Sequence, residues 1–586
     1  MGRSRVSNTL ESRMDDLALN ISSTFERWDT AREEQKQNWQ ELRDFLYAVD
    51  TTKTSNSKLP WSNKTTLPKL TQIMENLIAN YEAALFPNED WLKWEAGDYS
   101  STLKDKVSVV TAYTQAKLKA GGFREKVLEL LYDWVIYGNC FAVVEYSKVE
   151  KEDKDTGLTD VIFSGAKIRR ISPYDVVFNP TALSFRDSPK IVRYMKPLGD
   201  VALDAQTKPE LSYSQEVVDT LYSNRAAFSA LGKREKTEIR RAFQVDGFGS
   251  VDEYYQSGVV EILEFMGSVY DPETKQIHKD LIVTVVDRKY VLRVEELPTW
   301  NGEEYIKHVG WRNRPDNLWA MSPLENLMGL QYRIDHLENL KADIMDMVAY
   351  PIPVLKGDVD WDGWYPGSEV ILGDDGAIDL LRVDSAALSY DNQINLIEAR
   401  MEQYAGAPRE AMGIRTAGEK TAYEVQQLQN AASRMFQSKI SYFESVFLEP
   451  LVNQIFEVSR RNLDGADLIS VVDDEVGIND FITITKEDLK VKGNFYPRGA
   501  RHFAEKARFV QEVTQMLSTM PADVTNHLST KVIAKELAEQ FNLDKVGAYQ
   551  PNIRILEQIE AQKLLQAGQN QLEEAAMDSV EDPQVM

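Results

Sequence analysis

The chain has 586 residues, 43% of them hydrophobic and 10% aromatic, so it can bury a large core and is not a disordered protein. Its 92 acidic and 67 basic residues give a net charge of −25, which excludes a general grip on nucleic-acid phosphates and confines any DNA contact to local sites. The single cysteine excludes an intrachain disulfide, and the sequence has neither a zinc-ligand pattern nor the run of about 18 uncharged apolar residues that a membrane span needs.

The first part of the chain is predicted to be helical. Between residues 8 and 48, apolar residues recur at three- and four-residue spacing among many charges, which indicates a helical segment. The polar stretch 51–70 follows and carries Lys53, Lys58, Lys64 and Lys69 together with two prolines. It is predicted to be an exposed basic loop, either a solvated connector or an arm that contacts DNA or a neighbouring subunit.

The next segments predict an α+β body. One helix ends at Pro87, and a second ends at Gly138 in the manner of a left-handed cap. The β-rich run 140–146 follows at once, and we expect its Cys140 to be buried. Alternation of β-branched or aromatic residues with polar ones at 259–293, interrupted by two turn-like dipeptides, predicts an antiparallel meander of three strands.

A long helix is predicted at 323–350. Ser322 as the N-cap residue and Glu325 three positions later form a capping box, and Pro351 closes the segment. A helix of about 28 residues would span about 42 Å at 1.5 Å per residue. Its apolar stripe comprises Leu327, Leu330, Ile334, Leu337, Ile344 and Met347, whereas Arg333, Asp335, Glu338, Lys341 and Asp346 occupy the rest of the helix.

A small β insert is predicted between this helix and a returning one. Residues 351–386 combine strand and turn patterns, and between 356 and 384 they carry eight acidic and two basic side chains. The insert is too short and too acidic to be a separate enzyme domain. Because a second helix at about 389–405 returns from it, we expect a protruding hairpin that leaves the body of the protein.

The rest of the chain is predicted to be largely helical. A loop at 405–420, rich in glycine, alanine and arginine, leads into a long helix at about 422–459, which Pro450 would kink. Two short β-like stretches then precede an almost wholly helical end at about 500–577 and an acidic tail.

The loop contains an incomplete phosphate-binding motif. In 413–421 the two glycines of G-x-x-x-x-G-K-[ST] have the right separation, but an inserted Glu419 separates the second glycine from the Lys-Thr pair. No apolar strand precedes the loop, and a Thr-x-x-Glu capping box explains its last residues without a ligand. We therefore expect no nucleotide site, and Arg409, Arg415 and Lys420 are either solvated turn residues or contacts to something that passes by.

The order of several segments resembles the portal, or head-to-tail connector, proteins of tailed bacteriophages, especially the short-tailed ones. The segments are "LPWSNKTTLPKLTQIMENLIANYEAALFP", "LLYDWVIYGNCFAVVEY", "ISPYDVVFNP", "SPLENLMGLQYRIDHLENLKADIMDM" and "RTAGEKTAYEVQQLQNAASRMFQSKISYFESVFLEPLVNQIFE". The likeness covers most of residues 50–460. No single piece is specific, and the resemblance rests on the ordered set.

The resemblance implies an α+β, predominantly helical portal fold that forms a ring, typically of twelve subunits. The implied parts are an N-terminal helical arm and α+β wing at 1–318, a first stem helix at 319–350, a clip at 351–386, a second stem helix at 387–405, a tunnel loop at 406–420, a wing helix with return strands at 421–499, and a helical crown with an acidic tail at 500–586.

The resemblance also implies a function. Such a ring occupies one capsid vertex in the virion, after synthesis in the host cytoplasm, and conducts double-stranded DNA during packaging and ejection. Implied partners are the terminase large subunit, a tail adaptor, and the major capsid and scaffolding proteins, with no membrane, no cofactor and no catalytic activity. Arg409, Arg415 and Lys420 become candidate DNA-channel contacts, and the candidate partner interface of the clip comprises Asp358, Asp360, Trp361, Asp362, Trp364, Asp374 and Asp375.

Two other functions stay open on the sequence alone. A DNA-packaging ATPase or nuclease would use the near P-loop at 413–421. A helical scaffold or adaptor protein that does not contact DNA would share the apolar helices but not form a ring with a central hole. The net negative charge suits the portal interpretation, because DNA that slides along an acidic wall is repelled and not trapped.

Overall fold

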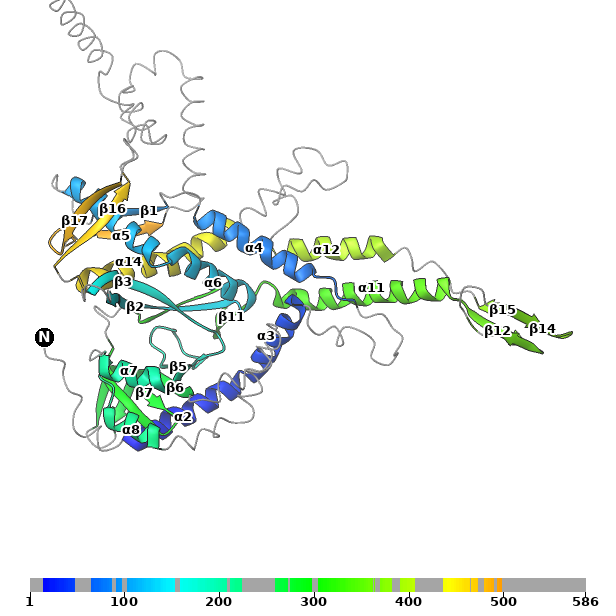
Figure 1. The fold of residues 1–586 in the computed structure, drawn as a ribbon, viewed down its shortest axis with the longest axis horizontal. Helices are drawn as coiled ribbons and strands as arrows, with labels where there is room; N and C mark the ends of the chain where they lie inside the picture. The colour runs from blue at the N-terminus through cyan, green and yellow to red at the C-terminus, as the bar shows by residue number, and fades with distance from the viewer. Residues whose placement is uncertain are drawn as a thin grey trace, which may run out of the picture.

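The computed structural model of the chain describes residues 14–47, 65–86, 91–96, 103–152, 159–207, 211–223, 259–271, 275–297, 304–361, 363, 369–381, 390–405, 436–463, 465–472, 479–489 and 493–497. Helices make up 50% and strands 32% of the described residues, so the chain is a mixed protein in which helix has the larger share, compatible with the predicted α+β class. A broad body carries a long rod that projects to one side (Figure 1).

The N-terminal helical segment is two helices and not one. Helix α2 (Met14–Ala31) and helix α3 (Glu33–Leu46) meet at Arg32, whose φ of −104° and ψ of 14° interrupt the helical path. The side chain of Arg32 is buried at this elbow, where it binds backbone carbonyls of another segment. A long-range contact therefore sets the break, which helical periodicity alone does not reveal.

The body is built around helices α4 (Lys69–Leu85) and α6 (Phe123–Ile136) and a three-stranded sheet in the order β3-β2-β9. Its strands are β2 (Asn139–Glu152), β3 (Thr159–Ile171) and β9 (Ile306–Gly310). Cys140 is buried in β2, as expected. Gly138, with a φ of +70°, supplies the left-handed turn between α6 and β2, and a Cβ there would lie 2.5 Å from the backbone of Met321.

A five-stranded antiparallel sheet in the order β4-β5-β6-β7-β8 forms the second part of the body. Its strands are β4 (Val176–Phe178), β5 (Lys190–Pro197), β6 (Val259–Asp271), β7 (Gln276–Val286) and β8 (Tyr290–Glu296). The predicted meander is confirmed as β6, β7 and β8, while β4 and β5 extend it. Helix α2 packs on one face of the sheet, and α7 (Leu198–Thr207) and α8 (Gln215–Ser223) contribute to a separate cluster with it.

The remaining body elements surround the helix that follows the predicted tunnel loop. Residues 436–443 are α-helical, a π-helical turn spans Glu444–Leu448, and α14 spans Glu449–Arg461. Pro450 lacks a backbone N–H and lies just after the π turn, so the irregularity expected at this proline is a local change of hydrogen-bond register. The other elements are β1 (Leu92–Ala96), which pairs with β18 (Gly493–Pro497), the β16 (Ala466–Val472) and β17 (Asn479–Thr485) pair, and α5 (Leu103–Ala120).

The rod begins after a small hairpin of β10 (Arg312–Arg314) and β11 (Asn317–Met321). It consists of α11 (Met328–Ala349), the strands β12 (Ile352–Lys356), β13 (Val359–Trp361), β14 (Val370–Leu372) and β15 (Ala377–Leu381), and the returning helix α12 (Asp391–Ala405). We call these six elements the projecting hairpin (Figure 1). Its helix, strand insert and returning helix are those that the sequence predicts.

Candidate functional site: the projecting hairpin

The body end of the hairpin is fixed by a small capping network. The N–H of Leu324 donates to Ser322 Oγ at 3.0 Å, and the N–H of Ser322 donates to Glu325 Oε1 at 3.3 Å. The hydroxyl of Ser322 also donates to the carbonyl of Val135 at 2.7 Å, which ties this corner to α6. Of the two reciprocal contacts of the predicted capping box, the one from the Ser322 N–H to Glu325 forms, whereas Ser322 Oγ accepts the N–H of Leu324 and not that of Glu325. The segment opens with a 3₁₀ turn (Glu325–Leu327), and residues 319–321 of the predicted first stem helix lie on strand β11.

Helix α11 is shorter than the sequence suggests. Its 22 residues correspond to about 33 Å at 1.5 Å per residue. The apolar stripe is fully buried near the body at Leu327, Ile334 and Leu337. Farther out, Met345, Val348 and Tyr350 are 45 to 63% exposed. The helix therefore leaves the core of its own chain about halfway along its length.

Three polar side chains on α11, four residues apart, hold an extended segment of the chain. Asn339 accepts the N–H of Thr65 at 2.7 Å and donates to the carbonyl of Thr65 at 3.0 Å. Gln331 donates to the carbonyl of Leu67 at 2.6 Å. We call this contact the polar ladder. The polar ladder pairs the backbone N–H and carbonyl groups of Thr65 and Leu67, as a neighbouring β-strand would. The backbone groups of a helix are already paired within the helix, so the partners have to be amide and carboxylate side chains four residues apart on one helix face.

Asp335 is the central member of the polar ladder. Its Oδ1 accepts the N–H of Leu67 at 3.0 Å and the side-chain amide of Gln331 at 2.9 Å. Its Oδ2 is buried and has no hydrogen-bond partner among the described residues. Burial raises the pKa of this carboxyl to about 6, and the two hydrogen bonds only partly offset that effect. Asp335 lies outside the apolar stripe, yet its side chain is inaccessible to solvent.

Helix α12 is tied to the body and to α11 by ion pairs. Lys69 Nζ lies 2.6 Å from Glu402 Oε1 and 3.6 Å from Glu398 Oε2, and Lys69 and Glu402 are both buried. Farther along the rod, Lys341 Nζ lies 2.6 Å from Asp391 Oδ1 in an exposed pair. The interpretation of 51–70 as an exposed basic stretch is therefore wrong at Lys69, which begins α4 and neutralises a buried carboxylate.

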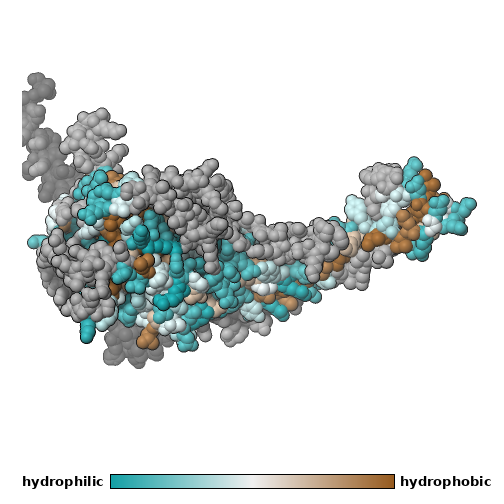
Figure 2. Space-filling model, turned by 90° about the horizontal axis from the view of Figure 1, so that it is seen from below, coloured by the Kyte–Doolittle hydropathy of each residue, from teal (hydrophilic) through white to brown (hydrophobic). Residues whose placement is uncertain are grey.

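Among the described residues, nothing packs against the strands at the far end of the rod to form a core. Side chains on β12, β14 and β15 are between 38 and 63% exposed, namely Ile352, Val354, Leu355, Val370, Ile371, Leu372 and Leu380. Because side chains alternate between the two faces of a strand, Val354 and Leu355 point to opposite faces, and so do Val370 and Ile371. Figure 2 shows these apolar residues as brown atoms along the far end of the projection.

The strands also leave backbone edges open. Within the part of the chain that the structure describes, β12 pairs only with β15 and β13 pairs only with β14, both antiparallel. A two-stranded sheet without a packed face is at best marginally stable in water. The far end of the rod is therefore built to be covered on its faces and paired along its edges.

Acidic side chains gather where the two strand pairs meet. A Cβ on Gly376 would lie 2.3 Å from the carbonyl oxygen of Asp358, and one on Gly357 would lie 2.1 Å from that of Asp375, so the two turns touch through their backbones. Asp358, Asp374 and Asp375 are all exposed there. The sequence-predicted interface residues Asp360 and Trp361 lie nearby on β13, whereas Asp362 and Trp364 lie outside the described residues.

Arg409, Arg415 and Lys420 of the predicted tunnel loop, and the near P-loop at 413–421, lie outside the described residues. The same holds for the predicted crown at 500–586. The described chain resumes at residue 436.

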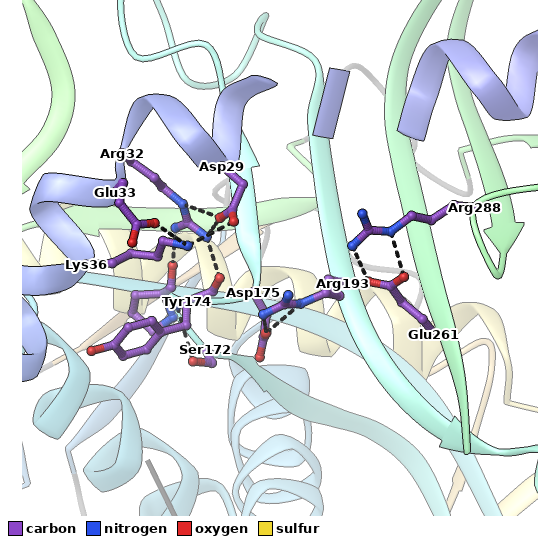
Figure 3. Close-up of polar contacts among 11 residues, drawn as sticks. Asp29, Arg32, Glu33, Lys36, Ser172, Tyr174, Asp175, Arg193, Glu261 and Arg288 are labelled. Carbon is purple, nitrogen blue, oxygen red and sulfur yellow. Dashed lines mark hydrogen bonds and ion pairs between the residues drawn. The ribbon is translucent and has the colours of Figure 1, made fainter. Parts of the chain in front are cut away.

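A large polar cluster, which the sequence did not single out, joins the α2–α3 elbow to the five-stranded sheet (Figure 3). Arg32 donates to Asp29 Oδ1 from Nε at 3.1 Å and to the carbonyl of Pro173 at 2.6 Å. Lys36 pairs with the other oxygen of Asp29 at 2.9 Å. Burial raises the pKa of Asp29, but Arg32 and Lys36 lower it more, so the net shift is downward.

A second pair of arginines continues this cluster along the sheet. Arg193 donates to Asp175 Oδ1 at 3.2 Å, and Arg288 Nε lies 2.8 Å from Glu261 Oε2 (Figure 3). The two guanidinium groups lie 5.7 and 5.6 Å from the centroid of the Phe25 ring. These contacts clamp α2 on the sheet, so the charges are accounted for by a structural role.

The described ranges contain neither a cluster of metal-binding side chains nor a membrane-spanning helix. No group of three or more His, Cys, Asp or Glu side chains there is placed to hold a metal ion. None of the helices there is long and apolar enough to cross a bilayer.

Comparison with known proteins does not assign the chain. A scan against models of protein families finds no match, and a search of curated proteins finds no significant match either. A functional conclusion therefore has to come from the residues and geometry of this chain.

Proposed function

We propose that this chain is a ring-forming portal protein of a tailed bacteriophage of the short-tailed type. Many copies surround a channel at one capsid vertex, through which double-stranded DNA enters and leaves. The observation that carries this proposal is the projecting hairpin, a rod that leaves its own core halfway and ends in apolar strands with no cover. A ring of identical rods covers such strands on both sides at once.

The size of the uncovered surface supports self-association. Seven apolar side chains at the far end are about half exposed. Complete burial of such a side chain is worth roughly 1.5–3 kcal/mol, so burying the exposed halves stabilises an interface by on the order of 5–10 kcal/mol per copy before association costs. In a heterologous contact of this kind, each copy is related to the next by the same rotation. The copies close into a ring when a whole number of these rotations makes one full turn.

The acidic charge fits a conduit for DNA. The exposed carboxylates at the tip of the hairpin, Asp358, Asp374 and Asp375, form the docking surface of the clip for the terminase motor and then for the tail adaptor. The net charge of −25 on each copy keeps DNA from adhering to the wall of the channel. Arg409, Arg415 and Lys420 supply brief contacts to the passing duplex, and the wing meets the capsid and scaffolding proteins.

A pair of substitutions at the far end of the hairpin tests the proposal. Leu355→Asp and Ile371→Asp together place charges on faces that must be buried in a ring, so the variant is expected to remain monomeric by mass photometry. The matched control places Asp at Leu183 and Ile277, which are also strongly exposed but lie on the body. A hairpin variant that assembles as well as the control would contradict the proposal.

The rival function is tested with the same protein. A packaging ATPase that uses 413–421 hydrolyses ATP in a reaction that Lys420→Ala abolishes, whereas a portal protein shows no turnover that depends on this lysine. Steady ATP hydrolysis lost in that variant would replace the portal proposal by the ATPase.

A further inference from the structure

Two cations share one tryptophan ring on the body, beside the root of the projecting hairpin. Lys439 Nζ lies 4.4 Å and Arg312 Cζ 5.5 Å from the centroid of the Trp311 ring. Lys439 also donates to the carbonyl of Trp311. Arg314, two residues farther on, is anchored to the carbonyl of Trp319 by Nη2 at 2.8 Å. We call Arg312, Arg314 and Lys439 the cationic corner.

The ring that carries the cationic corner is held rigidly. The backbone N–H of Trp311 donates to Gly138 at 2.8 Å, and its indole N–H donates to the hydroxyl of Tyr81 at 3.3 Å. The amide of Asn313 donates to the hydroxyl of Tyr442 at 2.6 Å, which joins the β10–β11 hairpin to the helix that bears Lys439. The corner is therefore organised before any partner arrives, and little side-chain entropy remains to be lost on binding.

No carboxylate in the described part of the chain forms an ion pair with these three cations. The nearest influence is Glu325, whose pKa is raised by burial and lowered in part by Arg314 and Arg312 without a direct contact. Arg312 and Lys439 are half-buried and Arg314 is exposed. Other buried cations, such as Lys117 and Arg293, have a carboxylate partner, since Lys117 lies 2.5 Å from Asp467 and Arg293 lies 2.8 Å from Glu264. Burial lowers the pKa of Lys439, and repulsion by Arg312 lowers it further. Holding Arg312 and Lys439 close together costs free energy, because the two positive charges repel each other. An anion bound from outside the chain would offset this repulsion.

We infer that the cationic corner is a contact between copies of this chain, and that it receives carboxylates from the neighbouring copy. Charge complementarity supports this occupant: with 92 acidic and 67 basic residues, a second copy offers an excess of carboxylates. Two copies of net charge −25 repel each other, so local cations without an ion-pair partner at the contact would favour association. The inference rests on the proposed ring, whose apolar hairpin contacts bring the second copy into place.

A nucleic acid is the less suitable partner for the same corner. It would meet the repulsion of the whole chain without the apolar contacts that the hairpin offers to a second copy. The guanidinium of Arg312 lies against the indole with its N–H groups available, which suits a carboxylate held in a fixed orientation.

Charge reversal of the corner is the decisive experiment. Arg312→Glu with Lys439→Glu is expected to raise the protein concentration at half-assembly at least tenfold, measured by mass photometry. The control, Lys93→Glu with Lys126→Glu, makes the same change in net charge at exposed cations that already have partners, Glu95 and Glu129, and is expected to have a much smaller effect. Arg312→Met with Lys439→Met keeps the packing on Trp311 and is expected to weaken the salt dependence of assembly.

The partner is identified by chemistry at Lys439. A zero-length carbodiimide cross-linker joins amines to carboxylates in contact, and a mixture of isotopically heavy and light chains separates links between copies from links within one copy. A Lys439 link between copies is expected. If both corner variants assemble like the wild type, the inference is overturned while the proposed ring stands. The inference is also overturned if the corner variants lose binding to a DNA duplex but assemble normally. A wild-type chain that never forms rings would instead refute the proposed function.

Discussion

Replacing Asp335 by Asn tests the polar ladder that holds α11 to residues 65–67. Asn keeps an oxygen for the N–H of Leu67 and exchanges the buried, unpaired Oδ2 for an uncharged group. The shift of the pKa from 3.8 to about 6 corresponds to roughly 3 kcal/mol at 1.36 kcal/mol per unit. Residual solvent screening reduces the expected gain to about 1–2 kcal/mol of unfolding free energy at pH 8.5.

The sign of the effect with pH is fixed by the direction of the shift. Because the folded-state pKa of Asp335 is raised, the folded state favours the protonated carboxyl, and stability from this group is lost as pH rises through about 6. The advantage of Asp335→Asn should therefore fall by roughly a quarter, about 0.3–0.6 kcal/mol, between pH 8.5 and pH 5.5. Both pH values lie above the sequence pI of about 4.8, where loss of net charge would promote aggregation.

Denaturant unfolding of the wild type and the variant at these two pH values gives the comparison. Glu338→Gln on the same helix removes the same charge from a less buried position and serves as the control for the change in net charge. The reasoning is refuted if Asp335→Asn destabilises the protein at pH 8.5, or if its effect does not change with pH.

Three further variants test other parts of the structure. Lys69→Met leaves Glu402 buried without its cation and should lower the unfolding free energy by about 3–5 kcal/mol, whereas removing both charges together should cost less; additive losses in a double-mutant cycle would argue against the pair. Gly138→Ala strains a φ of +70° and drives a Cβ into the backbone at Met321, so soluble expression should collapse, and a normal yield would contradict the close approach. Arg32→Lys keeps the charge but loses the forked guanidinium contacts at the α2–α3 elbow, so the melting temperature should fall. A loss of 1 kcal/mol lowers it by roughly 2–4 °C, and a melting temperature within 1 °C of the wild type would show that the elbow does not depend on these contacts.

The elements with strong local signals could be predicted from the sequence. The Gly138 turn, the β6–β8 meander and the helix, insert and returning helix of the projecting hairpin all carry their information within a few neighbouring residues. Periodicity and turn chemistry are sufficient for such elements, because the local preferences agree with the fold. The acidic turns of the insert were also visible as composition.

Features that depend on distant segments could not be predicted. The break at Arg32 arises because its side chain binds carbonyls about 140 residues away in the chain. From the sequence, Asp335 and Lys69 look like ordinary surface charges. In the fold, Asp335 binds the backbone of Leu67 and Lys69 binds the carboxylate of Glu402. Strands β4 and β5 were missed, because β4 is only three residues long and β5 finds its partner β6 more than 60 residues farther on.

The candidate interface shows the same division. The sequence located Asp358, Asp374, Asp375 and Trp361 in the insert. The three aspartates gather because two turns touch through their backbones at Gly357 and Gly376, and this contact is visible only in the fold. The cationic corner gave no signal at all, because two of its members lie on β10 and the third lies on a helix more than 120 residues later. Arg409, Arg415 and Lys420 stay predictions.

Electron cryomicroscopy of the purified full-length chain tests the central claim most directly. The account predicts closed rings in which neighbouring projecting hairpins pack side by side, with the apolar faces of β12 and β14 covered and a central channel wide enough for a DNA duplex. Single copies, or filaments without a pore, whose hairpins remain uncovered in solution would contradict it.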